Sequence, residues 1–115
     1  MNRRGRARER CSGFLYGAAR AADADPVEVI IGRARKNRAK GDPRRAMVLL
    51  REACALDEWR ARTWTILGAL LAELGRFGEA EQAYRQARWL RLRQGDRARS
   101  AVMDRLIASV ARAAA

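Results

Sequence analysis

The sequence predicts an all-α protein, a short α-solenoid in which about six helices form antiparallel pairs. Similar residues recur at an interval of 34 positions, with large side chains at Tyr16, Leu50 and Tyr84 and alanine at Ala19, Ala53 and Ala87. That interval is typical of repeats that consist of two helices and a turn. Glycines and Asp-Pro pairs interrupt the chain, and apolar residues between them recur at three and four positions, which indicates amphipathic helices.

The first elements in chain order are a basic arm and a short helix. Residues 1–10 form the arm, whose arginines are Arg3, Arg4, Arg6, Arg8 and Arg10. Because the arm has little apolar content, we expect it to be disordered in the free protein and to attract anionic partners. A helix is expected at residues 11–23, where Ser12, Tyr16 and Ala19 begin the 34-residue series.

Five further helices are expected, at residues 26–39, 43–57, 60–74, 78–93 and 96–112. Three of them are preceded by an aspartate that can cap the first turn, namely Asp25, Asp42 and Asp96. Proline follows the cap at Pro26 and Pro43, and Glu28 is placed to complete a capping box. Three breaks contain a glycine that suits the left-handed conformation of a helix end, namely Gly41, Gly75 and Gly95. Each glycine therefore separates two antiparallel helices.

Residues 61–94 resemble one tetratricopeptide repeat. The positions that carry this resemblance are Trp64, Leu67, Gly68, Leu71, Gly75, Phe77, Ala80, Tyr84 and Ala87. Leu92 stands where the family often has proline, so the second helix of this repeat should continue toward Gln94. Residues 27–60 resemble a weaker copy with a well-matched second helix. By the same resemblance, residues 11–94 form helical repeats and residues 95–115 hold a C-terminal capping helix.

The resemblance implies a concave groove, lined by the first helix of each pair, that receives an extended peptide or a helix. Carried over to this chain, the groove residues are Arg35, Arg38, Arg62, Thr65, Ala69, Ala72, Arg99 and Met103. Some family members clamp a terminal carboxylate with a lysine and asparagine set, but the equivalent positions here are Ile31, Arg35, Thr65 and Ala69. We therefore expect no such clamp.

Arginine dominates the charge of the chain. There are 25 basic residues against 13 acidic ones, the formal net charge is +12, and only Lys36 and Lys40 are lysines. Arginine forms bidentate contacts with carboxylates and phosphates, so anionic partners are favoured. The densest group, called here the basic cluster, comprises Arg33, Arg35, Lys36, Arg38, Lys40, Arg44 and Arg45. We interpret it as a binding surface rather than as a solvated helix face.

Other arginines and the tryptophans receive structural interpretations. Arg85, Arg88 and Arg91 are expected on a solvated outer face, since charged side chains are mostly exposed. Trp64 is expected in the core. Trp59 and Trp89 lie outside the repeat pattern, and we expect them to pack at junctions between helix pairs rather than to serve as exposed contact residues.

The composition argues against an enzyme and against a metal or cofactor site. Histidine is absent, and Cys11 and Cys54 lack the spacing of metal ligands. The sequence has no nucleophile beside a base and no phosphate-binding glycine loop. It also has no run of the ~18 apolar residues that a membrane span needs. Two isolated cysteines fit a reduced, cytoplasmic setting.

Two functions stay open. The first is an adaptor that binds an acidic peptide or protein surface through Arg35, Arg38, Arg62 and Arg99. Because two repeats offer limited area, oligomerisation would strengthen such binding. The alternative is an electrostatic nucleic-acid or ribosome-associated protein that uses the arm and the basic cluster. The arm has no interleaved aromatic residues that could stack on bases, so sequence-specific recognition is not expected.

Overall fold

The computed structural model describes residues 25–115, and in this range the chain is all-helical, without strands. The helices are α3 (Pro26–Ala39), α4 (Pro43–Leu56), α5 (Ala61–Glu73), α6 (Phe77–Arg93) and α7 (Arg97–Ala114). Each begins and ends within two residues of an expected helix. The continuation of α6 to Arg93 confirms that this helix runs past Leu92. The expected helix at 11–23 and the arm at 1–10 lie outside the described residues.

The helix ends use the cap residues that the sequence predicts. The Asp25 carboxylate accepts a hydrogen bond from the backbone N–H of Val27, at 2.9 Å. Asp42 and Asp96 accept in the same way at the start of α4 and α7. Gly41, Gly75 and Gly95 have φ values of 89°, 77° and 74°. A residue with a Cβ rarely adopts this conformation, so the three turns depend on glycine.

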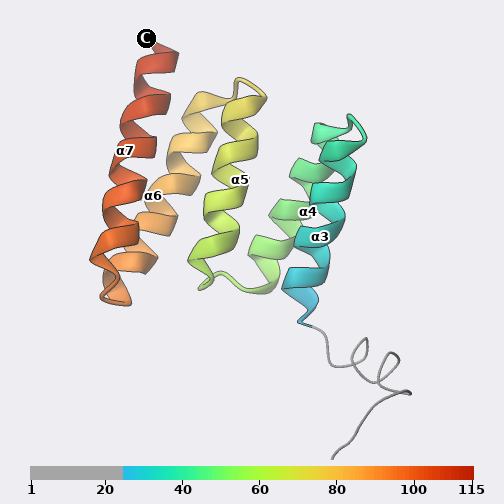
Figure 1. Cartoon of the computed structure of the whole chain (residues 1–115), viewed down its shortest axis with the longest axis horizontal. Coiled ribbons are helices and arrows are strands. Elements are labelled where there is room, and N and C mark those ends of the chain that lie inside the picture. Colours follow the sequence, from blue (N-terminus) through green and yellow to red (C-terminus); the bar gives the residue numbers. More distant parts are fainter. Residues whose placement is uncertain (1–24) are drawn as a thin grey trace, which may run out of the picture.

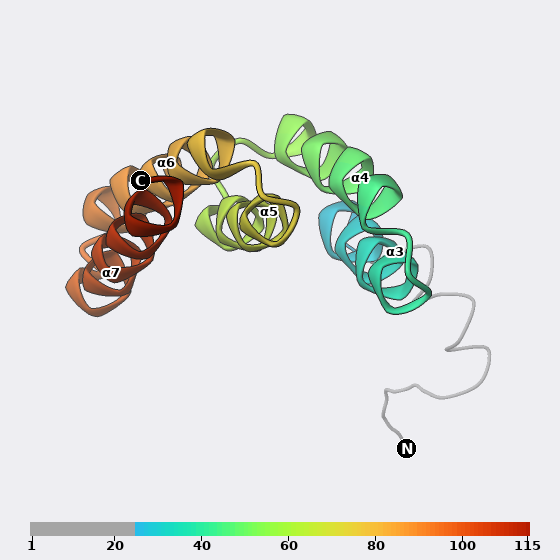
Figure 2. The ribbon, with the colours of Figure 1, turned by 90° about the horizontal axis from the view of Figure 1, so that it is seen from above.

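Successive helices lie antiparallel and side by side (Figure 1). Seen from above, they form an arc with α3, α5 and α7 on its inner side and α4 and α6 on its outer side (Figure 2). Packing joins each helix to the next along the chain, from α3 to α7. No comparable packing joins α3 directly to α5. This leaves space between them on the inner side.

The 34-residue series occupies equivalent core positions in the two helix pairs. Its described members are buried, with at most 3% of each residue exposed: Ala46, Leu50, Ala53, Ala80, Tyr84 and Ala87. The four alanines among them let neighbouring helices approach closely. Trp64 is partly buried, packs against this core and donates a hydrogen bond from its indole N–H to the carbonyl of Glu58, at 3.0 Å.

The arginine series of α6 does not form the single outer stripe expected from the sequence. Arg85 is exposed and pairs with Glu81 on the same helix. Arg88 pairs instead with Asp104 of α7, and Arg91 lies in a cleft on the inner side. The physical reason is that a spacing of three residues falls about 60° short of a full helical turn, so the series winds around α6.

Candidate functional site

The first part of the candidate site is a cleft between α3, α4 and α5, with a volume of about 310 Å³. Its lining residues are Ala34, Arg35, Arg38, Ala46, Leu50, Thr65, Ile66, Ala69, Leu70 and Glu73. The cleft exists because α3 and α5 diverge on the inner side of the arc. Apolar side chains of α3, α4 and α5 therefore form its base, while Arg35, Arg38 and Glu73 supply its charges.

A second cleft of about 330 Å³ lies between α5, α6 and α7. It is lined by Arg62, Thr65, Ile66, Arg91, Arg99, Val102 and Met103. Thr65 and Ile66 of α5 line both clefts, so the two form one continuous surface along the inner side of the arc. Seven of the eight groove residues expected from the sequence lie on this surface: Arg35, Arg38, Arg62, Thr65, Ala69, Arg99 and Met103. Ala72 does not line either cleft.

A bidentate ion pair bridges α3 and α5 at one end of the first cleft. Arg38 donates from Nε to Glu73 Oε1 at 2.8 Å and from Nη2 to Oε2 at 2.9 Å. The Arg38 guanidinium holds the pKa of the Glu73 carboxyl below its usual value. Both side chains are about half exposed, so the pair contributes little to stability. An acidic partner would have to compete with Glu73 for Arg38.

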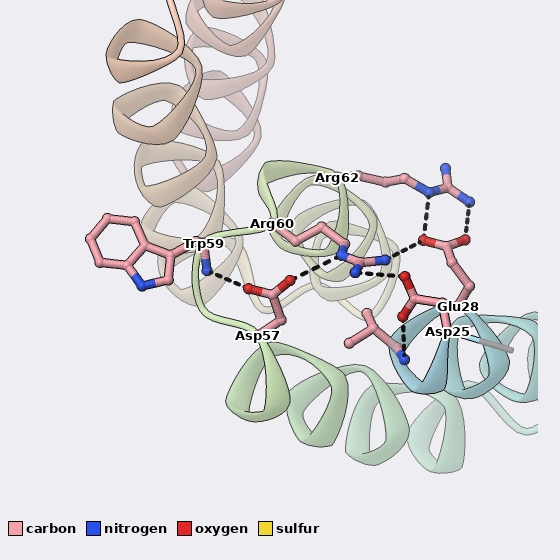
Figure 3. Close-up of polar contacts among 7 residues, drawn as sticks. Asp25, Glu28, Asp57, Trp59, Arg60 and Arg62 are labelled. Atoms are coloured by element: carbon pink, nitrogen blue, oxygen red, sulfur yellow. Dashed lines mark hydrogen bonds and ion pairs between the residues drawn. The ribbon is translucent and has the colours of Figure 1, made fainter. Parts of the chain in front are cut away.

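A larger network joins α3 and α5 at their other ends (Figure 3). Glu28 accepts hydrogen bonds from Arg62 at 3.1 and 3.2 Å and from Arg60 at 3.1 Å. Arg60 also pairs with Asp25 at 2.7 Å and with Asp57 at 3.3 Å. Hydrogen bonds from Arg62 lower the pKa of Glu28. The Glu28 carboxylate thus bonds to arginines at the start of α5, whereas the sequence led us to expect a local capping box at the start of α3.

The remaining inner-side arginines differ in their partners. Arg99 pairs with Asp96 one helical turn away, at 2.9 Å. Within residues 25–115, neither Arg35 nor Arg91 forms an ion pair with an acidic residue. The Nε atom of Arg91 is buried and has no hydrogen-bond partner in the described part of the chain. A buried donor without a partner is energetically costly.

The sequence patterns predict neither Glu28 and Glu73 as partners of the groove arginines nor Ile66 and Arg91 as cleft residues. The two acidic residues could have been found from the 34-residue interval of the sequence. Glu28 and Arg62 are 34 residues apart, and Arg38 and Glu73 are 35 apart. Equivalent positions of adjacent repeats lie near one another, so opposite charges at this interval predict a bridge between repeats. Arg91 could not be found in this way, because its place depends on how α6 is rotated against its neighbours.

Most of the basic cluster carries no ion pair within the described residues. Arg38 is its only member that pairs with an acidic residue there. All seven members are exposed, and they follow α3, its terminal turn and the start of α4. The cluster therefore presents a dense positive charge at one edge of the arc.

No protein-family model and no curated protein matches this chain. Within residues 25–115, no helix is both long and apolar enough to cross a membrane. The same stretch contains no group of three cysteine, histidine, aspartate or glutamate side chains arranged to hold a metal ion.

Proposed function

We propose that this protein is a binding adaptor whose inner surface accepts an acidic peptide or an acidic protein surface. The observation that carries the proposal is the continuous inner surface, where Arg35, Arg91 and Arg99 surround apolar side chains. Apolar contact gives affinity, whereas arginines select for acidic groups and orient carboxylates. The likeness of residues 61–94 to a tetratricopeptide repeat supports the same surface, and with it a short α-solenoid.

The partner is best described as an acidic segment with an apolar side chain between its charges. The first cleft has the apolar base that such a side chain needs, and the flanking arginines would hold the neighbouring carboxylates. Arg38, Arg62 and Arg99 are already paired with Glu73, Glu28 and Asp96. Binding therefore exchanges internal carboxylates for those of the partner, and Arg35 and Arg91 are the arginines that need no exchange within residues 25–115.

A charge-reversed pair of variants tests the adaptor function. Arg35→Glu changes the first cleft, and Arg44→Glu makes the same change of net charge in the basic cluster outside both clefts. The probe is a fluorescent glutamate-rich peptide with one central leucine, followed by anisotropy. We expect Arg35→Glu to weaken binding about tenfold, which is about 1.4 kcal/mol, and Arg44→Glu to change it much less. Equal losses in both variants would refute the inner surface as the site.

The exposed basic cluster favours a second candidate, electrostatic binding of nucleic acid, with the arm as a further contact. Each phosphate that an arginine neutralises adds to the salt dependence of binding. The test is whether the purified protein retains RNA or DNA at low salt and loses it steeply as salt rises. Joint replacement of Lys36, Lys40, Arg44 and Arg45 by glutamine should flatten this dependence. A protein that retains no nucleic acid at low salt would exclude this candidate.

A further inference from the structure

Two tryptophans that are far apart in sequence meet on the surface. Trp59 lies in the connection between α4 and α5, and Trp89 lies on α6. Their ring centroids are 6.0 Å apart and the rings are tilted by 36°. Trp59 is 63% exposed and Trp89 is 45% exposed. The two rings therefore pack against each other at the junction between helix pairs, as expected, but they also remain substantially exposed to solvent.

The position of Trp59 is held by polar contacts of the backbone. Its N–H donates to Asp57 Oδ1 at 3.1 Å, and Asp57 Oδ2 accepts from Arg60 Nε at 3.3 Å. Figure 3 shows the indole pointing away from the ion-pair network that fixes this connection. Trp89 stands on a helix whose other face is buried through Ala87 and Leu90. Both rings are thus presented to solvent from ordered backbone.

Arginine completes this surface. The guanidinium carbon of Arg93 lies 4.9 Å from the centroid of the Trp89 ring and 5.9 Å from that of Trp59. Within residues 25–115, neither Arg93 nor the exposed Arg97 forms an ion pair. Both lie at the turn from α6 to α7, on the same edge of the arc as the connection that holds Trp59 (Figure 1). Two exposed indole rings and two arginines without an ion pair in the described residues therefore lie at the same edge of the molecule.

We propose that Trp59, Trp89 and Arg93 form a platform that stacks unpaired bases of single-stranded nucleic acid, while Arg97 contacts the phosphate backbone. Stacking on exposed aromatic rings together with arginine is how single strands are bound without regard to sequence. Because the ring centroids are 6.0 Å apart, a base does not fit between the rings and stacks on a ring face that neither the other ring nor Arg93 covers. The basic cluster lies at the other edge of the arc and contains positive charges but no aromatic side chain on which a base could stack.

The charge of the surface favours this ligand over a second copy of the chain. Self-association through the tryptophans would bring Arg93 and Arg97 of two copies together, in a protein whose net charge is +12. Like charges across an interface are costly. A nucleic-acid strand supplies the opposite charge and flat bases at once. The inference is independent of the adaptor function, and it adds base contacts to the electrostatic binding considered as the second candidate.

The test uses the full chain and a fluorescent thymidine oligonucleotide of about 12 residues, a length within the range that one binding domain covers. A duplex of the same length serves as the comparison. We expect the single strand to bind more tightly and to quench tryptophan fluorescence. The Trp59→Leu/Trp89→Leu variant should lose at least tenfold in affinity, whereas Trp59→Phe/Trp89→Phe should retain most of it, because phenylalanine can still stack.

A second pair of variants separates the contribution of Arg93 from a general effect of net charge. Arg93→Gln should weaken binding more than Arg112→Gln, which removes another exposed arginine near the C-terminal end of α7. Circular dichroism and melting curves establish that each variant is folded. If the leucine variant does not fold, the comparison of Arg93→Gln with Arg112→Gln and the quenching of the wild-type protein decide the matter.

Three outcomes would overturn the platform. One is equal affinity of the leucine variant and the wild-type protein. Another is a dimer, detected by sedimentation, that the leucine change abolishes, because the rings would then serve a second copy. The third is loss of binding on neutralising the basic cluster with no effect of the tryptophan changes. That last result would leave electrostatic nucleic-acid binding intact and refute only the platform.

Discussion

At the scale of single residues, the two helix pairs carry different side chains at equivalent packing positions. A Cβ added to Gly68 would lie 2.7 Å from two ring carbons of Tyr84, which is itself 3% exposed. In the preceding pair, the positions 34 residues earlier hold Ala34 and Leu50. Leucine replaces the aromatic ring where alanine replaces glycine. The smaller residue on one helix thus accompanies the larger residue on the other: glycine with tyrosine in one pair, and alanine with leucine in the other.

This contact predicts that Gly68→Ala destabilises the protein by about 1–3 kcal/mol, although alanine favours a helix, because a well-packed core resists added volume. Gly32→Ala is the control, since a Cβ there meets nothing within 4 Å and should stabilise α3. Urea unfolding measures both. The double variant Gly68→Ala/Tyr84→Leu should cost less than the sum of its single changes. Strict additivity would show that the two positions do not share one contact.

At the scale of helices, α3 and α5 are joined on the inner side through ion pairs between exposed side chains. Because such pairs stabilise little, their more important effect concerns binding: Glu73 occupies Arg38 and Glu28 occupies Arg62. The internal carboxylates act as competitors of an acidic partner. Arg38 and Arg62 therefore become available to an acidic partner only when it displaces Glu73 and Glu28.

Accordingly, Glu73→Gln should raise the affinity for the glutamate-rich peptide severalfold while changing the melting temperature little. The reason is that Arg38 then meets the partner without displacing a carboxylate. Glu52→Gln removes the same charge from an exposed position of α4 that forms no ion pair within the described residues. Anisotropy titrations compare the two. An equal rise in both variants would mean that only net charge matters, and a fall with Glu73→Gln would contradict competition.

At the scale of the whole molecule, the arc consists of the α3 and α4 pair and the group α5 to α7. Packing of α4 on α5 connects them, and the ion pairs of α3 with α5 close the inner side. The pKa values of Glu28 and Glu73 lie below the ordinary 4.5 because of Arg62 and Arg38. The stabilisation from these pairs is thus complete above about pH 4.5 and is lost as the pH falls through the lowered values.

We therefore expect the inner side to open as the pH is lowered below 4.5, before α4 separates from α5. Spin labels at Lys40→Cys and Arg112→Cys, in a chain with Cys11→Ser and Cys54→Ala, report the distance across the arc. The distance should increase in acid while helicity by circular dichroism persists. A Glu28→Gln/Glu73→Gln chain, in which only the Asp25–Arg60 pair still bridges α3 and α5, should show a longer distance than the wild-type protein already at neutral pH. A distance independent of pH in the wild-type protein would show that packing alone sets the arc.

The sequence by itself determined the helices and their order, because these depend on local chemistry. Asp25, Asp42 and Asp96 cap their helices through bonds a few residues long, and Gly41 and Gly75 permit the left-handed turns. The 34-residue interval also determined which side chains share the core. Even the bridge from Glu28 to Arg62 follows that interval, once equivalent positions are compared.

Only the tertiary structure decided how far α3 and α5 diverge, where Arg91 points and that Trp59 meets Trp89. These features depend on the angle and rotation between packed helices, which result from many small contacts summed over the whole arc. A rotation of α6 by one residue would move Arg91 out of its cleft and part the two rings. No local pattern records that angle, so the clefts and the aromatic platform became visible only in three dimensions.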